Sequence, residues 1–258
     1  TLFVPAGLVA GSSPVLLALA LATLVLAALG ALAATRLRTL VAHLVVASAG
    51  TLLLAVSLGS ERGVAAGLFY LVPSTLVACA WFLLADRIAG ARGGSDRLQP
   101  GQHPAAWGAL GIGFFVAAIA VAGVPPLGAF MGKALLLQAA GTTPWAGWVV
   151  AGVLASSLMV MVALARAGSV LFWERGSAPA GDEATALRHP RLARAATAGA
   201  LAAVVLCAVA AGPIGRYTGD TAAQLFAPQR YVQAVLGAQP VPAAIDVRRE
   251  MRERGELK

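Results

Sequence analysis

The feature that most constrains this chain is a pair of prolines inside a long apolar run that also carries one lysine. The run covers residues 107–140, and Lys133 is its one charged residue. Pro125 and Pro126 lack a backbone N–H, and their rings clash with the preceding helical turn. A straight membrane helix needs about 20 residues, so this run has room for two half-helices joined at 124–128. We therefore expect a broken helix with a cation just beyond the break.

Three glycines, Gly123, Gly128 and Gly132, flank the prolines and are expected to let the backbone bend and neighbouring helices approach. An ionisable side chain inside a bilayer is costly and typically marks a substrate or proton path. Half-helix ends also expose carbonyls and amides that water or ions can use. The alternatives are a proline that only kinks the helix and a lysine that snorkels to the headgroups. The pattern favours Lys133 as a proton-carrying group beside a hinge.

The remaining apolar runs predict a multi-pass helical membrane protein. The chain is 59% hydrophobic and 12% charged, whereas a soluble domain carries about 25% charged residues. Long Ala, Leu and Val runs favour helices over the short alternating strands of a β-barrel. We expect an all-α bundle over residues 1–213, followed at 214–258 by an interfacial segment and a polar tail. The expected spans are 14–34, 39–58, 64–88, 107–140 (broken), 145–172 and 195–211.

The net charge of +8 does not indicate nucleic acid binding, because the arginines gather in the connections between apolar runs. The connections after the first, third and fifth spans are rich in arginine, and those after the second and fourth carry Arg62 as their one basic residue. By the positive-inside rule, the arginine-rich connections should face the cytoplasm and contact anionic lipid. We expect a multi-pass membrane protein.

Three further ionisable residues are second-tier candidates for proton transfer on the cytoplasmic side. Arg166 lies about two turns before the end of the fifth span, where it either snorkels or faces the inner mouth of a path. His43 lies near the start of the second span, and histidine is a residue type that can relay protons, although an interfacial role is the alternative. Asp86 closes the third span and either pairs locally or receives protons.

Six intramembrane hydroxyls are typical of helix packing and could also order a chain of waters: Ser48, Thr51, Ser74, Thr75, Ser156 and Ser157. The sequence contains no glycine-rich phosphate loop, no spaced metal ligands and no catalytic-triad pattern. We therefore expect no cofactor, no metal and no enzyme active site.

The segment AGVPPLGAFMGK at 122–133 resembles the broken-helix motif of the antiporter-like subunits shared by respiratory complex I and the Mrp-type multisubunit Na+/H+ antiporters. Three further segments resemble the D-type subunits of the Mrp antiporters: LVAHLVVASAGTL at 40–52, ARAGSVLFW at 165–173 and TAAQLFAPQRYVQAVLG at 221–237. LFYLVPSTL at 68–76 and FLLAD at 82–86 also fit.

The resemblance implies a subunit with about fourteen spans built from two inverted repeats, of which this chain would be the second repeat and the closing helix. Lys133 matches the family's key lysine on the second broken helix. Related complex I subunits usually carry histidines in the preceding span, where this chain has Pro73. His43 stands where many relatives have an aromatic residue.

Together, the residues and the resemblance predict a membrane subunit of a cation/proton antiporter complex of the bacterial inner membrane. This subunit would associate with other subunits and with lipid, and would exchange protons for Na+ or K+. One alternative is a proton-pumping subunit of a respiratory NADH or hydrogenase complex. An alternative of another class is a structural subunit that conducts nothing.

Overall fold

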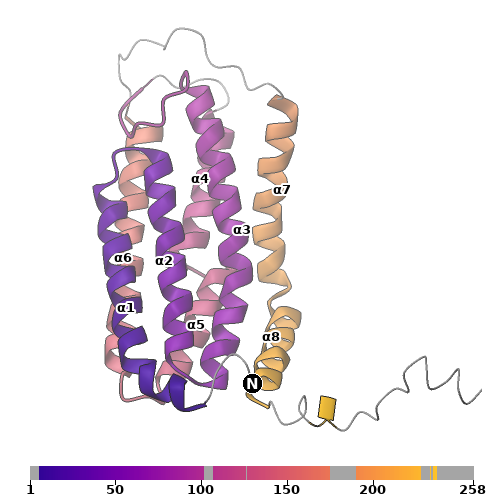
Figure 1. The fold of residues 1–258 in the computed structure, drawn as a ribbon. Helices are drawn as coiled ribbons and strands as arrows, with labels where there is room; N and C mark the ends of the chain where they lie inside the picture. Colours follow the sequence, from indigo (N-terminus) through magenta and orange to yellow (C-terminus); the bar gives the residue numbers. More distant parts are fainter. Residues whose placement is uncertain are drawn as a thin grey trace, which may run out of the picture. The chain divides into compact units, whose positions relative to one another are not determined.

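The computed structural model describes residues 6–101, 107–125, 127–174 and 190–227, together with residues 233, 235 and 236. Within this part of the chain the regular structure consists of α-helices (Figure 1). The chain separates into two units, Thr1–Ala223 and Gln224–Lys258, and the helix bundle belongs to the first. The helices are α1 (Ala6–Ala33), α2 (Leu37–Ser57), α3 (Glu61–Ala91), α4 (Trp107–Ala122), α5 (Gly128–Ala140), α6 (Ala146–Phe172), α7 (Pro190–Val209) and α8 (Ala211–Phe226).

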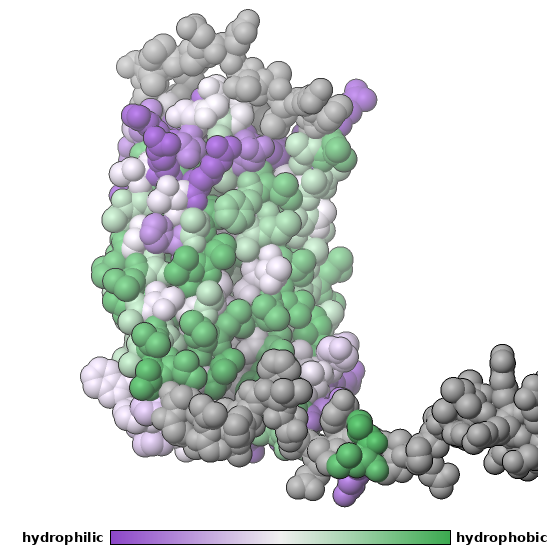
Figure 2. Space-filling model, viewed as in Figure 1, coloured by the Kyte–Doolittle hydropathy of each residue, from purple (hydrophilic) through white to green (hydrophobic). Residues whose placement is uncertain are grey.

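The bundle has the length and surface of a membrane-spanning structure, which confirms the expected fold class. Helices α1, α2, α3, α6 and α7 are long and apolar enough to cross a membrane, and α4 is a shorter apolar helix that α5 continues after a break. Figure 2 shows apolar side chains over the middle of the visible face and hydrophilic ones towards its ends. Such a band is what the hydrocarbon core of a bilayer requires.

Two helix boundaries differ from those that the prolines suggested. Helix α1 begins at Ala6, ahead of the expected start at residue 14, and Pro14 lies inside it. The sixth span is expected to run to residue 211, ahead of the Gly-Pro pair at 212–213, but α7 ends at Val209 and α8 begins at Ala211, with Pro213 in its first turn. There the missing N–H is not needed, because the first amides of a helix have no partner within it. Most of the expected tail lies outside the described residues.

Two separate apolar clusters form the core of the bundle. One joins the arginine-rich end of α2, α3, α4 and α6, and includes Trp81 and Phe114 with rings in edge-to-face contact at 5.0 Å. The other joins the opposite end of α1, α2, α5 and α6, and includes Leu24 and Leu136. The broken helix passes from the first cluster to the second. Its break therefore lies between two layers of buried apolar side chains.

The connections after α1 and α3 are hydrogen-bonded to one another at the arginine-rich end. The amide of Leu37 donates to the carbonyl of Asp96 at 2.7 Å, and that of Leu98 donates to the carbonyl of Thr35 at 2.9 Å. Arg92 donates to the carbonyl of Arg97 at 2.6 Å. These contacts hold the first residues of α2 and the last residues of α3 in fixed positions.

Candidate functional site

The break between α4 and α5 begins with a left-handed glycine. Gly123 has φ of 77°, a conformation that costs a side-chain-bearing residue roughly 1–2 kcal/mol. The amide of Val124 then reaches back to the carbonyl of Ile119 at 3.3 Å. A glycine at this position with such a bond is the Schellman ending of a helix. Pro125 follows, so the chain cannot resume α4, and the expected broken helix is confirmed.

The two other glycines of the expected hinge lie within α5 and serve close packing against α3. A Cβ atom on Gly132 would lie 2.9 Å from Cβ and 3.0 Å from Cα of Tyr70, and one on Gly128 would lie 3.3 Å from Cβ of Pro73. Both glycines are buried. The left-handed residue of the break is therefore Gly123, while Gly128 and Gly132 let α5 approach α3. Pro126 lies outside the described residues.

Lys133 folds back from α5 onto the end of α4. Its Nζ donates to the carbonyl oxygen of Ala122 at 3.1 Å and to Oγ of Ser157 on α6 at 3.0 Å. Ala122 is the last residue of α4, where carbonyls have no partner within the helix and the helix dipole is negative. The lysine thus satisfies an orphan carbonyl of one half-helix while it belongs to the other.

The lysine side chain lies directly against Gly123, where the absence of a side chain leaves room for it. A Cβ atom at this position would lie 2.9 Å from Cδ and 3.1 Å from Nζ of Lys133. A Cβ atom this close would push the flexible end of the lysine side chain aside. Gly123 therefore serves both the left-handed backbone and the present position of the Lys133 side chain.

A small cavity of about 20 Å³ has Lys133 among its lining residues. A cavity needs about 10–15 Å³ to hold one water molecule, so this one has room for a single water. Its other polar side chains carry hydroxyls, and no carboxylate is among the lining residues that the structure describes. Leu24 of one apolar cluster and Val160 of the other complete the wall. The hydroxyl-bearing lining residues are Ser48, Thr51, Tyr70, Ser156 and Ser157.

The hydroxyls around this cavity are oriented to accept hydrogen bonds. Ser48, Thr51 and Ser156 each donate to a carbonyl of their own helix at 3.0–3.1 Å. Tyr70 donates to Oγ of Ser48 at 3.4 Å. Since a hydroxyl has one donor and two acceptor lone pairs, the remaining lone pairs of these serines and of Thr51 are available to a cation or to water.

A second cavity of about 10 Å³ adjoins the first and leads towards the arginine-rich end. It shares Ser48 with the lysine cavity, and Ser74 and Trp81 also line it. Its volume is at the lower limit for one water. Trp81 itself is buried and donates its indole N–H to the carbonyl of Ala117 at 3.2 Å. Beyond Ser48, the route towards Trp81 is narrow and largely apolar.

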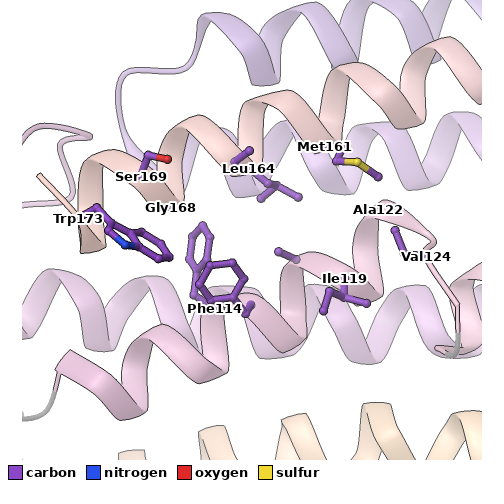
Figure 3. Close-up of a pocket in the computed structure, with 12 residues that line it drawn as sticks. Phe114, Ile119, Ala122, Val124, Met161, Leu164, Gly168, Ser169 and Trp173 are labelled. Atoms are coloured by element: carbon purple, nitrogen blue, oxygen red, sulfur yellow. The ribbon is translucent and has the colours of Figure 1, made fainter.

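A wider crevice beside the break is apolar, and Lys133 is not among its lining residues. It has a volume of about 330 Å³ between α4 and α6 and runs from Val124 to Trp173. Figure 3 shows Phe114, Met161 and Leu164 projecting into the space between the two helices. Ser169 supplies a hydroxyl to an otherwise apolar wall. This wall suits hydrocarbon, and none of its lining residues carries a charge.

The other three candidate residues lie away from the lysine cavity. Asp86 forms an ion pair with Arg38 at 2.8 Å, and both side chains are more than half exposed. Nδ1 of His43 lies 2.8 Å from the carbonyl of Thr39 on its own helix. The ring of His43 packs so closely against α1 that a Cβ atom on Gly30 would collide with it.

Arg166 donates to the carbonyl of Ala34 at 2.8 Å and so joins α6 to the connection between α1 and α2. None of these three residues lines the cavity around Lys133. Their roles in proton transfer stay predictions. Sequence reasoning did not select Tyr70, whose signal was a hydroxyl three residues before a proline in an apolar span.

The chain is a helical membrane bundle with a broken span, and a lysine of one half-helix bonds the free end of the other. Broken helices and intramembrane ionisable residues of this kind are typical of polytopic membrane transport proteins. The family model described as NADH:quinone oxidoreductase/Mrp antiporter, transmembrane, matches residues 6–159. The chain belongs to this family.

The chain is similar both to subunits of cation/proton antiporters and to a subunit of NADH-quinone oxidoreductase. The chain is 31% identical over 245 residues to a protein named as the probable D subunit of a K+/H+ antiporter of Rhizobium meliloti, covering 84% of this chain and 44% of that protein. It is 27% identical over 221 residues to the Na+/H+ antiporter D subunit of Bacillus subtilis, covering 84% and 43%. It is 31% identical over 211 residues to the NADH-quinone oxidoreductase N subunit of Salinibacter ruber, covering 78% and 40%.

Solved structures agree with this assignment. A chain of the Mrp complex from Dietzia superimposes with a TM-score of 0.71 at 25% identity, covering 87% of this chain and 49% of that one. A chain of respiratory complex I from Thermus thermophilus superimposes with a TM-score of 0.70 at 26% identity, covering 83% and 44%. The chain spans less than half the length of the relatives it matches.

Proposed function

We propose that this chain forms about half of an antiporter-like membrane subunit of a cation/proton antiporter complex, and that Lys133 carries protons within it. The Na+/H+ and K+/H+ antiporter names of its relatives support the antiport reading. A subunit of such a complex works with other subunits of the same membrane and is a secondary transporter, not an enzyme.

The observation that carries the proposal is the pair of acceptors around Nζ of Lys133. An ammonium has three N–H donors, and the carbonyl of Ala122 and Oγ of Ser157 accept two of them. A water in the adjoining cavity would accept the third. These acceptors and the negative end of α4 stabilise the charged lysine, while the two apolar clusters disfavour any charge. Opposing effects of this kind leave the group able to change its charge.

Ser157 fits both protonation states of the lysine. Its Oγ accepts from the ammonium as described, and its O–H can rotate to donate to the lone pair of the neutral amine. The neutral amine keeps two N–H donors, so it can still donate to the carbonyl of Ala122 while it accepts from Ser157. The proton would leave Nζ through a water in the adjoining cavity, with Ser48 and Tyr70 as the next hydroxyls.

Replacement of Lys133 by alanine in the assembled complex tests the proposal. We expect cation/proton antiport in everted membrane vesicles to be abolished, while the complex purifies with all its subunits. Gln138→Ala, one turn further along the same half-helix and exposed, is the matched control and should leave antiport intact. Full antiport in Lys133→Ala would overturn the proposal, and loss of assembly alone would support a structural subunit that conducts nothing.

A second candidate function is proton pumping in a respiratory complex, which the likeness to the N subunit of NADH-quinone oxidoreductase and to complex I favours. The two functions differ in their driving reaction. Antiport needs only a Na+ or K+ gradient, whereas respiratory pumping needs a reductant and an electron acceptor. The test measures proton movement in vesicles that contain the complex and a cation gradient but no reductant. Protons move under these conditions if the complex is an antiporter, and do not move if it is a respiratory pump.

A further inference from the structure

A wide groove lies on the bundle surface at the end opposite the arginine-rich connections. It has a volume of about 570 Å³, and its walls come from the first turns of α3, the last turns of α5 and the first turns of α8. All of its lining residues belong to the unit Thr1–Ala223. We call it the α3–α5–α8 groove.

The floor of this groove is apolar and firmly packed. Ala66, Phe69 and Ala139 line it and are at most 2% exposed. On the α8 side, a Cβ atom on Gly215 would lie 3.9 Å from the Phe69 ring. From Arg62 to Phe69 the groove follows α3 for about 10 Å, at 1.5 Å per residue. Such a surface suits a hydrocarbon chain lying along the helix.

Two arginines are the charged residues of the groove wall. Arg62 lies in the first turn of α3 and Arg216 lies on α8, and both are exposed. The two ion pairs found among the described residues, Arg36 with Asp96 and Arg38 with Asp86, are at the other end of the bundle. The groove therefore combines an apolar floor with two cations that no carboxylate of its lining neutralises.

The position of the groove coincides with a membrane surface. Trp145 and Trp148, at the start of α6, are 39% and 69% exposed, and tryptophans of this kind lie at the headgroup level of a bilayer. The turn between α5 and α6 brings them to the same end of the bundle as Gln138 in the groove wall. Arg62 and Arg216 are thus within reach of phosphate groups.

We propose that the α3–α5–α8 groove binds an anionic phospholipid, with the phosphate held by Arg62 and Arg216 and an acyl chain lying over Phe69. A transmembrane helix of a partner subunit fits less well, because it would cover both guanidinium groups in an apolar setting and leave them without counter-charge. A lipid phosphate supplies that charge and leaves the guanidinium groups in contact with water. Arginine pairs with phosphate through two parallel hydrogen bonds, which favours retention of the lipid.

The test uses the assembled complex in nanodiscs of equal parts phosphatidylglycerol and phosphatidylcholine, followed by native mass spectrometry of the lipids that survive detergent. We expect wild type to retain phosphatidylglycerol selectively. Arg62→Gln with Arg216→Gln should lower that retention roughly thirtyfold, given the usual contribution of each cation near anionic lipid. Arg191→Gln, an exposed arginine at the start of α7, is the matched control and should retain the lipid.

A second variant separates the groove from general surface charge. Ala65→Phe fills the groove without changing charge and should release phosphatidylglycerol, whereas Ala151→Phe on an exposed face of α6 should not. Equal retention in wild type and the double arginine variant would overturn the proposal, as would a partner helix found in the groove by electron microscopy of the complex. The readout is lipid retention, so it is independent of whether the complex performs antiport.

Discussion

Nζ of Lys133 lies 3.1 Å from the carbonyl oxygen of Ala122, so a residue in the second turn of α5 bonds the last residue of α4. The contact joins the two half-helices α4 and α5 across the break. It also couples the charge of the lysine to the position of α4, because the ammonium and the helix end attract one another. A change in the charge of Lys133 therefore changes the strength of its hydrogen bond to the end of α4.

Replacement of Ser157 by alanine should slow antiport about tenfold, because the charged lysine loses an acceptor and hydrogen bonds to charged groups contribute about 1.5–3 kcal/mol. Ser157→Thr keeps the hydroxyl and should retain most of the rate. Ser169→Ala, in the apolar crevice of Figure 3, is the control that removes a hydroxyl on the same helix. Initial rates in everted vesicles provide the measurement. A normal rate of antiport in Ser157→Ala would show that Ser157 takes no part in proton exchange at Lys133.

Replacement of Gly123 by alanine should destabilise the complex and disturb Lys133 at once. The left-handed backbone alone costs roughly 1–2 kcal/mol, and the new Cβ would displace the lysine side chain. We expect a lower melting temperature in detergent together with reduced antiport. Gly147→Ala is the matched control, since a Cβ there meets nothing within 4 Å. Equal melting temperatures for the two variants would contradict the role assigned to Gly123.

Trp81→Phe should lower stability by about 1 kcal/mol, because the indole hydrogen bond to the carbonyl of Ala117 is lost. Trp148→Phe removes an indole that is 69% exposed and should have a smaller effect. The difference between the two variants in thermal unfolding of the purified complex is the quantity to measure. A larger effect for Trp148→Phe would mean that the indole bond to α4 contributes little.

The exposed pair of Arg38 and Asp86 should contribute no more than about 1 kcal/mol to stability, as surface ion pairs do. Arg38→Gln and Asp86→Asn should therefore have equally small effects on unfolding and on antiport. Antiport lost in Asp86→Asn but kept in Arg38→Gln would instead give Asp86 the proton-receiving role.

The break and its lysine could be predicted from sequence, because the missing N–H of Pro125 and the cost of an intramembrane cation are local properties. The partners of Lys133 could not be. Ala122 and Ser157 lie 11 and 24 residues away, and only the packing of α6 against both half-helices brings them together. The pairing of Arg38 with Asp86 spans 48 residues and depends in the same way on how α2 packs against α3.

The start of α8 shows a different limit. A Gly-Pro pair at 212–213 indicates the end of a helix, yet the same residues suit the first turn of a new one. The sequence alone does not distinguish these two positions. Where α8 lies matters, because it supplies one wall of the α3–α5–α8 groove.

Lys133→Arg is the most direct test of the central claim. Arginine keeps the positive charge and can still donate to Ala122 and Ser157, but its guanidinium does not release a proton in proteins. If proton exchange at residue 133 drives antiport, the variant should assemble normally and show no cation/proton antiport in everted vesicles. Antiport at the wild-type rate in Lys133→Arg would mean that the lysine only holds the break together, and would contradict the account.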